Sequence, residues 1–324
     1  MRIFRRQIAL IAGVTVFACF VTACSSNTSK KEDTNNVKDT ESAIEHTDRN
    51  EDESEDDMGV DLTDIFSERE LAQTADTSEA ANIELVSGQN VTITEEGTYV
   101  VTGSAENSSI IVDSADDAKI QLVLDGVNIT NISTPAIYVK SADKVFVTTT
   151  ESENTLSVTD TFTTDGDTKT DAVIFSKDDL VLNGVGTLNI KSTDNGISSK
   201  DDLRVTGGTL NIESTSDSIE ANDSVKIGGG IITLKSQKDG IHCENKEDYK
   251  LGAVYIAGGT ISIEAADDGI QGTSLIIEDG MIDIENTGNS FQYDALGMLG
   301  GGTVTVDGKE MTELPPSSSQ TQAE

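Results

Sequence analysis

A pattern of 14 residues occurs twice in the sequence, 22 residues apart: residues 207–220 read GGTLNIESTSDSIE and residues 229–242 read GGIITLKSQKDGIH. Aligning the chain on the glycine before each apolar alternation extends the pattern to six copies, with spacings of 22, 22, 29, 21 and 22 residues, at Gly186, Gly208, Gly230, Gly259, Gly280 and Gly302. A repeat this short cannot bury its apolar face alone, so successive copies must stack on one another. The repeat therefore restricts the chain to a solenoid or another repeat architecture.

Each copy contains three short segments with the character of strands. The clearest alternates apolar and polar residues, as Leu188, Asn189 and Ile190 do, and two shorter apolar segments precede it. Three strands and three turns in about 22 residues leave no room for a crossover helix, and propeller blades need about 40 residues. We therefore predict an all-β fold, a right-handed parallel β-helix of roughly nine coils, counted from Tyr99 to Val306.

The N-terminus has the features of a secretion signal. Three arginines within the first six residues precede an apolar run over residues 8–20, which is shorter than the ~20 residues that span a bilayer. The run ends before VTACS, residues 21–25, which resembles a bacterial lipobox. Such a signal, residues 1–23, is removed and Cys24 is lipidated, which predicts a lipid-anchored protein on the extracellular face of the bacterial cell membrane. An ordinary secretory signal is the alternative.

Composition divides the rest of the chain into three parts. Residues 24–81 are polar or charged without apolar periodicity, which predicts an acidic disordered spacer in which only residues 62–71 favour a short helix. The β-helix is expected over residues 82–314, with an excursion at residues 244–250 where the repeat is longer. The polar sequence of residues 315–324 predicts a disordered tail.

The charge of the chain restricts its partners. Removal of the signal would take three arginines and no acidic residue, which leaves 58 Asp and Glu against 19 Lys and Arg, a net charge of −39. This excess excludes nucleic acid and favours multivalent cations, of which calcium is the first expectation outside the cell. Cys19 would leave with the signal and Cys24 would be lipidated, so Cys243 remains alone and is expected to be a buried apolar filler.

An acidic or amide pair stands in the turn before one strand of each repeat. Aligned to within one residue, the pairs are Thr170/Asp171, Asp194/Asn195, Ser216/Asp217, Lys238/Asp239, Asp267/Asp268 and Gly288/Asn289. Turn formation is one explanation, because Asp and Asn tolerate left-handed backbone. However, carboxylates in adjacent coils would stand about 5 Å apart and repel each other by about 1 kcal/mol even in water. A calcium ion bound between them would replace this repulsion by attraction. The predicted calcium ligands are Asp194, Asp217, Glu220, Asp239, Asp267 and Asp268.

A second acidic series lies at the next corner of the repeat. It consists of Asp178/Asp179, Asp201/Asp202 and Asp223, and the nearby Lys177 and Lys200 are expected to neutralise it. We therefore rank this corner below the first as a metal site.

Few side chains are suited to stacking on a sugar ring, because the chain has no Trp and only five Tyr. Tyr255 alternates outward and follows the excursion that carries Tyr249, so this pair is the best candidate platform, with His242 as a third candidate sugar contact. Ordinary strand positions for the two tyrosines are the alternative. With only His46 and His242, the chain has no credible Ser–His–acid or Cys–His arrangement.

The segments DNGISSKDDLRVTGGTLNI, DSIEANDSVKIGGG and DGIHCENK resemble a family of bacterial secreted and lipid-anchored β-helix proteins, the carbohydrate-binding domain-containing proteins. The resemblance covers about residues 125–305 and is strongest over residues 171–285. The family is similar in fold to the calcium-dependent pectate lyases of polysaccharide lyase family 9. The resemblance implies binding of plant cell-wall polysaccharides such as cellulose and polygalacturonate, with bound calcium.

The same resemblance suggests a catalytic alternative. The related lyases hold calcium with an Asp pair and an Asp from the adjacent coil, which Asp267, Asp268 and Asp239 match. A further acidic ligand is expected three residues after the pair, where this chain has Gln271, and no lysine stands out as the base. The departure favours a binding protein over a calcium-dependent lyase. A structural or adhesive rod without glycan specificity is the third reading.

Overall fold

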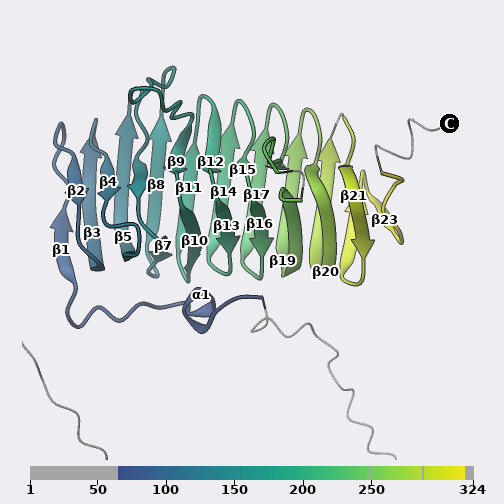
Figure 1. The fold of residues 1–324 in the computed structure, drawn as a ribbon, viewed down its shortest axis with the longest axis horizontal. Coiled ribbons are helices and arrows are strands. Elements are labelled where there is room, and N and C mark those ends of the chain that lie inside the picture. The colour runs from purple at the N-terminus through teal and green to yellow at the C-terminus, as the bar shows by residue number, and fades with distance from the viewer. Residues whose placement is uncertain (1–64, 249, 287, 318–324) are drawn as a thin grey trace, which may run out of the picture. The chain divides into compact units, whose positions relative to one another are not determined.

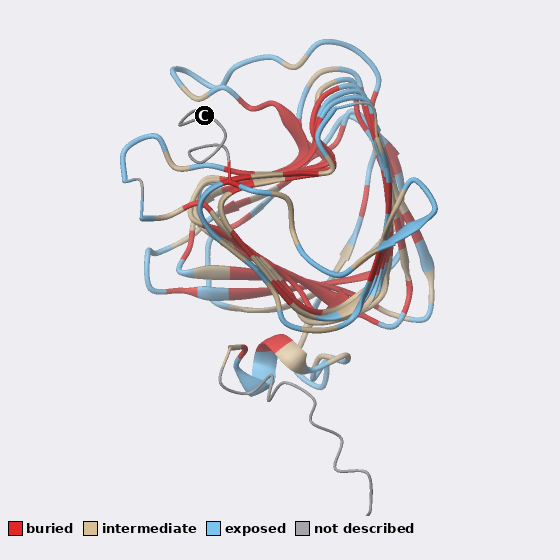
Figure 2. Ribbon diagram, turned by 90° about the vertical axis from the view of Figure 1, so that its right-hand side faces the viewer, coloured by how far each residue is buried: buried red, intermediate tan, exposed pale blue. Residues whose placement is uncertain are grey.

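The computed structural model describes residues 65–248, 250–286 and 288–317, which form 23 strands and one short helix, α1 (Glu68–Leu71). The strands stack in parallel as about nine coils of a β-helix (Figure 1). Viewed along the stack, three faces surround a buried interior (Figure 2). The predicted all-β parallel β-helix is confirmed. None of the helices in the described ranges is long and apolar enough to cross a membrane.

Each coil contributes one strand to each of three sheets, which we number in the order in which the coil from β12 to β14 passes through them. The first sheet contains β2 (Val91–Ile93), β4 (Ile110–Asp113), β6 (Ile137–Ser141), β9 (Ala172–Ser176), β12 (Asn195–Ser199), β15 (Ile219–Ala221), β18 (Ile241–Cys243) and the starts of β20 (Ile270–Asn286) and β21 (Phe291–Leu299). The second contains β1 (Ala81–Glu84), the starts of β3 (Gly97–Glu106) and β5 (Lys119–Asn131), β7 (Lys144–Thr149), β10 (Asp179–Gly184), β13 (Asp202–Val205), β16 (Ser224–Ile227), the start of β19 (Ala253–Ala265) and later parts of β20 and β21.

The third sheet contains the ends of β3, β5, β19 and β20 together with β8 (Glu153–Val158), β11 (Thr187–Lys191), β14 (Thr209–Ser214), β17 (Ile231–Ser236) and β22 (Thr303–Val306). An antiparallel strand, β23 (Lys309–Met311), pairs with β22 and closes the last coil. The turn between them uses Asp307 and Gly308, both at positive φ (47° and 73°), and Met311 packs against the core.

The sequence repeat reappears as the register of these sheets. Leu188 pairs with Leu210, and Leu210 pairs with Ile232, so residues aligned by the repeat lie directly above one another. Their side chains point inward and are at most 3% exposed, as part of one apolar core that runs through all the coils. Cys243 is fully buried in the same core, as predicted for an apolar filler.

Residues 65–80, which we call the strap, pack against the outer face of the second sheet. Figures 1 and 2 show α1 outside this face, and Phe66 is only 1% exposed, with its ring against Gly228. A Cβ atom at Gly228 would lie 2.8 Å from that ring, so glycine is required for the close approach. Gln73 accepts a hydrogen bond from the Gly184 N–H (3.2 Å) and donates one to the Thr206 carbonyl (3.2 Å). The structure therefore differs from the spacer expected over residues 24–81, because its C-terminal part folds onto the β-helix. Residues 1–64, with the signal and Cys24, and the tail from 318 lie outside the described residues.

A buried ionic network lies under the strap. Glu70 is 3% exposed and its Oε1 atom lies 2.5 Å from Lys144 Nζ and 3.4 Å from Arg204 Nε. Arg204 also pairs with Asp179 (3.1 Å) and Asp202 (2.7 Å), and Lys144 pairs with Asp179 (3.2 Å). Two aspartates of the second acidic series are therefore neutralised by Lys144 and Arg204.

The charge of Lys177 acts on Asp178, as expected, but the expectation that Lys200 neutralises that corner is wrong. Lys200 lies 3.6 Å from Glu220, a residue of the first sheet, instead.

Candidate functional site

The turns before the strands of the first sheet carry a ladder of hydrogen bonds from backbone to side chain. At each step, a side-chain Oδ1 atom accepts the backbone N–H of the equivalent residue in the next coil. The steps join Asp217 to Asn195 (3.0 Å), Asp239 to Asp217 (3.0 Å), Asp268 to Asp239 (2.9 Å) and Asn289 to Asp268 (2.7 Å). The ladder satisfies backbone donors in a largely buried turn, so the recurrence of Asp and Asn at this position has a structural cause.

The ladder requires an acceptor but no charge. Asn195 supplies an amide oxygen at the first step, whereas Asp217, Asp239 and Asp268, which we call the carboxylate column, supply carboxylates at the later steps. Asn289 ends the ladder as a donor. The three aspartates are only 5–6% exposed. Carboxylates one coil apart repel by about 1 kcal/mol in water and by more where water is excluded. An amide would form the same ladder without this repulsion, and a bound cation would offset the repulsion.

Two clusters of ligand atoms lie on the carboxylate column. The histidine cluster consists of Asp217, Asp239 and His242, and the aspartate cluster consists of Asp239, Asp267 and Asp268. In each cluster, one ligand atom per residue lies within 4.8 Å of the others. Asp239 belongs to both clusters, so the two are continuous along the coils.

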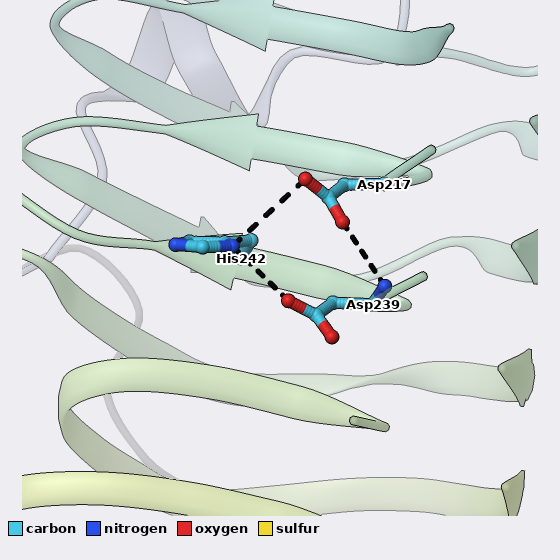
Figure 3. Close-up of side chains that lie close together, drawn as sticks. All are labelled: Asp217, Asp239 and His242. Atoms are coloured by element: carbon cyan, nitrogen blue, oxygen red, sulfur yellow. Dashed lines mark hydrogen bonds and ion pairs between the residues drawn. The ribbon is translucent and has the colours of Figure 1, made fainter. Parts of the chain in front are cut away.

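In the histidine cluster, the imidazole points at both carboxylates (Figure 3). His242 Nδ1 lies 3.1 Å from Asp239 Oδ2 and 3.9 Å from Asp217 Oδ2. Its Nε2 atom lies 3.7 Å from a carboxylate oxygen of Glu244. A protonated His242 would neutralise part of the column, and this cluster mixes nitrogen with oxygen ligands.

The aspartate cluster offers oxygen ligands alone, which is the donor chemistry that calcium prefers. Asp239 and Asp268 are buried and fixed by the ladder, whereas Asp267 is exposed and opens the cluster to solvent. With one oxygen from each residue, the cluster supplies three of the six to eight oxygens that calcium takes, so water or a bound molecule would complete the shell. The residues of this cluster fit calcium.

Burial perturbs the protonation of the column. It raises the pKa of Asp217 above the ordinary aspartate range, although the Asp239 N–H bond and the charge of His242 act in the opposite direction. Burial likewise raises the pKa of Asp268, and its hydrogen bonds from Asn289 partly offset this. The hydrogen bond to Asp239 raises the pKa of His242, burial lowers it, and the charge of Asp217 adds to the increase.

Two predicted calcium ligands lie outside both clusters. Glu220 accepts hydrogen bonds from Asn195 (2.7 Å) and Ser198 (2.9 Å), and it faces a pocket of about 480 Å³ that His242 also lines. Asp194 is half-buried, and its pKa is raised by burial. In the preceding coil, Ala172 pairs with Asn195. Asp171 therefore aligns with Asp194, and the repeat alignment shifts by one residue.

The candidate sugar platform does not lie at the clusters. Tyr255 is on β19 in the second sheet, between Lys226 and Ile276, whereas the clusters lie on the first sheet. Tyr249 lies outside the described residues. Sequence reasoning brought His242 and the tyrosines together as one set, and the structure places Tyr255 on a different face.

A substitution of His242 tests its role as an internal counter-ion. Because its folded pKa is raised above 6.5, charged His242 stabilises the fold below about pH 6.5, and this contribution is lost as the pH rises through the folded pKa. His242→Gln is a mild change, since Gln271 and Gln292 stand at the same position in the next two coils. With a chelator present, we expect the melting temperature of the wild type to fall more than that of the variant between pH 6 and pH 8. Parallel pH profiles would contradict the assignment.

The fold and the site define a parallel β-helix with clustered carboxylates along one sheet. The family model for "Carbohydrate-binding domain-containing protein" matches residues 87–317. A protein of that name from Acetivibrio thermocellus (strain ATCC 27405) is 47% identical over 190 residues, which cover 57% of this chain and 66% of the relative, just under two thirds of its length. A solved structure, the gadolinium derivative of a polysaccharide lyase-like protein from C. thermocellum, is similar with a TM-score of 0.64 and 33% identity, and it matches over 69% of this chain and 99% of its own.

The chain therefore belongs to the family of carbohydrate-binding domain-containing proteins. The resemblance expected from the repeat phrases is confirmed. This membership supports a carbohydrate-binding role.

Proposed function

We propose that this protein is a non-catalytic carbohydrate-binding protein, anchored through a lipid on Cys24 to the extracellular face of the bacterial cell membrane. Its ligand is a plant cell-wall type polysaccharide such as cellulose or polygalacturonate, and calcium is its cofactor. Family membership supports the carbohydrate ligand. The observation that carries the proposal is the column of three buried carboxylates at ladder positions that an amide could fill.

Calcium in the aspartate cluster would have a functional as well as a stabilising use. Asp239, Asp267 and Asp268 would hold it, and its remaining coordination positions would accept carboxylate or hydroxyl oxygens of a glycan. This lets a chain with a large negative charge bind an acidic polymer without a basic groove. The relative solved as a gadolinium derivative is consistent with this idea, because a lanthanide, like calcium, is a hard cation that prefers oxygen ligands.

Catalysis is not part of the proposal. Elimination beside a uronate needs a base whose pKa is lowered near the metal. The hydrogen bond to Glu264 (2.6 Å) raises the pKa of Lys235, which is the opposite of what a base requires. The position three residues after the Asp268 ligand is Gln271, a neutral residue.

A retention experiment tests the proposal. The full chain in mild detergent is applied to amorphous cellulose and to polygalacturonate gel, each with calcium and with a chelator, beside an uncoated matrix. We expect retention on at least one polymer, and release by the chelator where calcium takes part in binding. Circular dichroism in the chelator checks that the fold persists. Failure to bind either polymer with calcium, with the fold intact, would leave the structural rod as the better interpretation.

A further inference from the structure

The outer face of the third sheet and the turn after it are hollowed along the axis of the β-helix. Three hollows, of about 370, 490 and 540 Å³, share lining residues with their neighbours: Lys191, Glu213 and Lys235 line the first two, and Glu264 lines the last two. They extend from β8 to the turn after β22, across seven successive coils. Only the first hollow lies over a column of short polar side chains of the sheet, and the other two lie beyond the charged residues that it shares with its neighbour. We call this first hollow, which crosses β8, β11, β14 and β17, the groove, and it lies on a different sheet from the carboxylate column.

The groove exists because short and long side chains occupy separate columns. Its floor consists of Thr155, Asn189, Asn211 and Thr233. They belong to an outward column of Ser, Thr, Asn and Asp side chains that continues beyond the groove as Ser104, Asn128, Ser262, Asp283 and Thr305. Its wall is the next outward column, which carries long charged side chains such as Lys191, Glu213 and Lys235. Asn is depleted in strands, so Asn128, Asn189 and Asn211 are not explained by strand propensity.

The floor offers hydrogen-bonding groups without a strong charge. Asn211 donates to Asn189 (2.9 Å), which keeps both amides aligned along the axis. Among the residues that the structure describes, the hydroxyls of Thr155 and Thr233 have no hydrogen-bond partner. Each hydroxyl can donate and accept, as a sugar hydroxyl can. The strand ladder holds these groups rigidly, so binding would cost little conformational entropy.

We propose that this groove binds an extended, neutral polysaccharide chain that runs parallel to the axis of the β-helix. The coil spacing of about 4.8 Å is only slightly shorter than one pyranose unit of an extended chain, so each coil of the groove would meet about one sugar with a hydroxyl or an amide. Many weak, equal contacts along one polymer add up to firm retention. This inference rests on the proposed carbohydrate-binding function and adds to the aspartate cluster a second binding face, for neutral glycans.

The charges of the wall select against an acidic chain. Lys191 pairs with Glu213 (3.1 Å) and Lys235 pairs with Glu264 (2.6 Å), so the two lysines are already neutralised. Glu285 and Asp307, which line the last hollow, add negative charge without a basic residue beside them in that lining. A neutral glycan such as cellulose fits this groove, and an anionic glycan would be repelled from it.

Blocking the groove at one position tests the inference. Thr233 lies on the floor of the groove, and Thr233→Cys provides an attachment point for a bulky polyethylene glycol maleimide. Ile276→Cys, a half-buried outward position on the second sheet, is the matched control. Cys243 is buried, which raises the pKa of its thiol far above the ordinary range, so it should not react with the maleimide. The wild type treated in the same way is the control for reaction at other cysteines.

We expect unmodified Thr233→Cys to be retained on amorphous cellulose like the wild type, and the modified protein to lose about tenfold or more in affinity. Modified Ile276→Cys should keep full retention. Retention that survives modification at residue 233 would overturn the groove while leaving the proposed function in place. If modification at residue 233 abolished binding to polygalacturonate but not to cellulose, the assignment of a neutral glycan as the ligand would be wrong. Absence of wild-type binding to either polymer would overturn the proposed function and the groove with it.

Discussion

Replacing Glu70 by Gln is expected to lower the free energy of unfolding by about 3–5 kcal/mol, the usual cost of leaving a buried charge uncompensated. Under the strap, Glu70, Asp179 and Asp202 balance Lys144, Arg204 and Lys226. Gln has the same size, and its side-chain oxygen can still accept the Ser67 N–H that Glu70 accepts at 2.8 Å. The loss would therefore report the missing charge rather than a missing helix cap. Urea unfolding followed by circular dichroism measures it.

The pH dependence of this difference provides a second check. Burial alone would raise the pKa of Glu70, but the hydrogen bonds from Lys144 and the Ser67 N–H and the charge of Arg204 outweigh it, so the pKa lies below its ordinary 4.5. A carboxyl group with a lowered folded pKa stabilises the fold above the unfolded pKa, and the effect is lost as the pH falls through the folded pKa. The difference in the free energy of unfolding between the wild type and Glu70→Gln should therefore reach its full size above about pH 4.5 and disappear in stronger acid.

Glu264→Gln is the matched control for this prediction. Glu264 pairs with Lys235 at 2.6 Å, but both side chains are more than half exposed, at 64% and 58%. Solvent-exposed pairs contribute about 0–1 kcal/mol, so this variant should unfold almost like the wild type. Equal effects of the two substitutions would mean that the strap is not held by its buried network.

The fold was predictable because the repeat encodes its own register. In a parallel β-helix, like residues stack, so aligning Leu188, Leu210 and Ile232 in the sequence also aligns them in space. The strap was not predictable in the same way. Its residues have no periodicity, and its contacts join positions far apart in the chain, as Glu70 and Arg204 are.

The candidate site was predictable in its residue types but not in its geometry. The alternation of Asp and Asn at one corner identified the carboxylates, but the ladder joins the side chain of one coil to the backbone of the next. Such a bond depends on side-chain rotamers that the sequence does not reveal. The one-residue error near Asp171 has a simpler cause, because the loop over residues 159–171 interrupts the 22-residue period.

Asp239→Asn is expected to abolish stabilisation of the protein by calcium. Both ligand clusters contain Asp239, so one substitution removes a carboxylate from each. The amide oxygen of Asn can still accept the Asp268 N–H, as Asn195 accepts the Asp217 N–H, so the ladder is kept. At a calcium concentration about 100 times its Kd, the wild type should gain about 2.7 kcal/mol, and the variant should gain almost nothing.

The metal-free proteins should behave in the opposite way. In a chelator at pH 8, Asp239→Asn removes repulsion with Asp217 and Asp268, each pair costing about 1 kcal/mol, so the variant should be as stable as the wild type or slightly more stable. Thermal unfolding with and without calcium measures both effects.

Asp283→Asn controls for a general loss of negative charge. Asp283 is exposed on the third sheet and belongs to neither cluster, so its calcium response should match that of the wild type. If Asp239→Asn keeps the full calcium response while Asp283→Asn loses it, the cation binds on the third sheet instead. The carboxylate column would then have to be explained without a metal. Proton sharing among its carboxyl groups is the explanation that the raised pKa values of Asp217 and Asp268 favour.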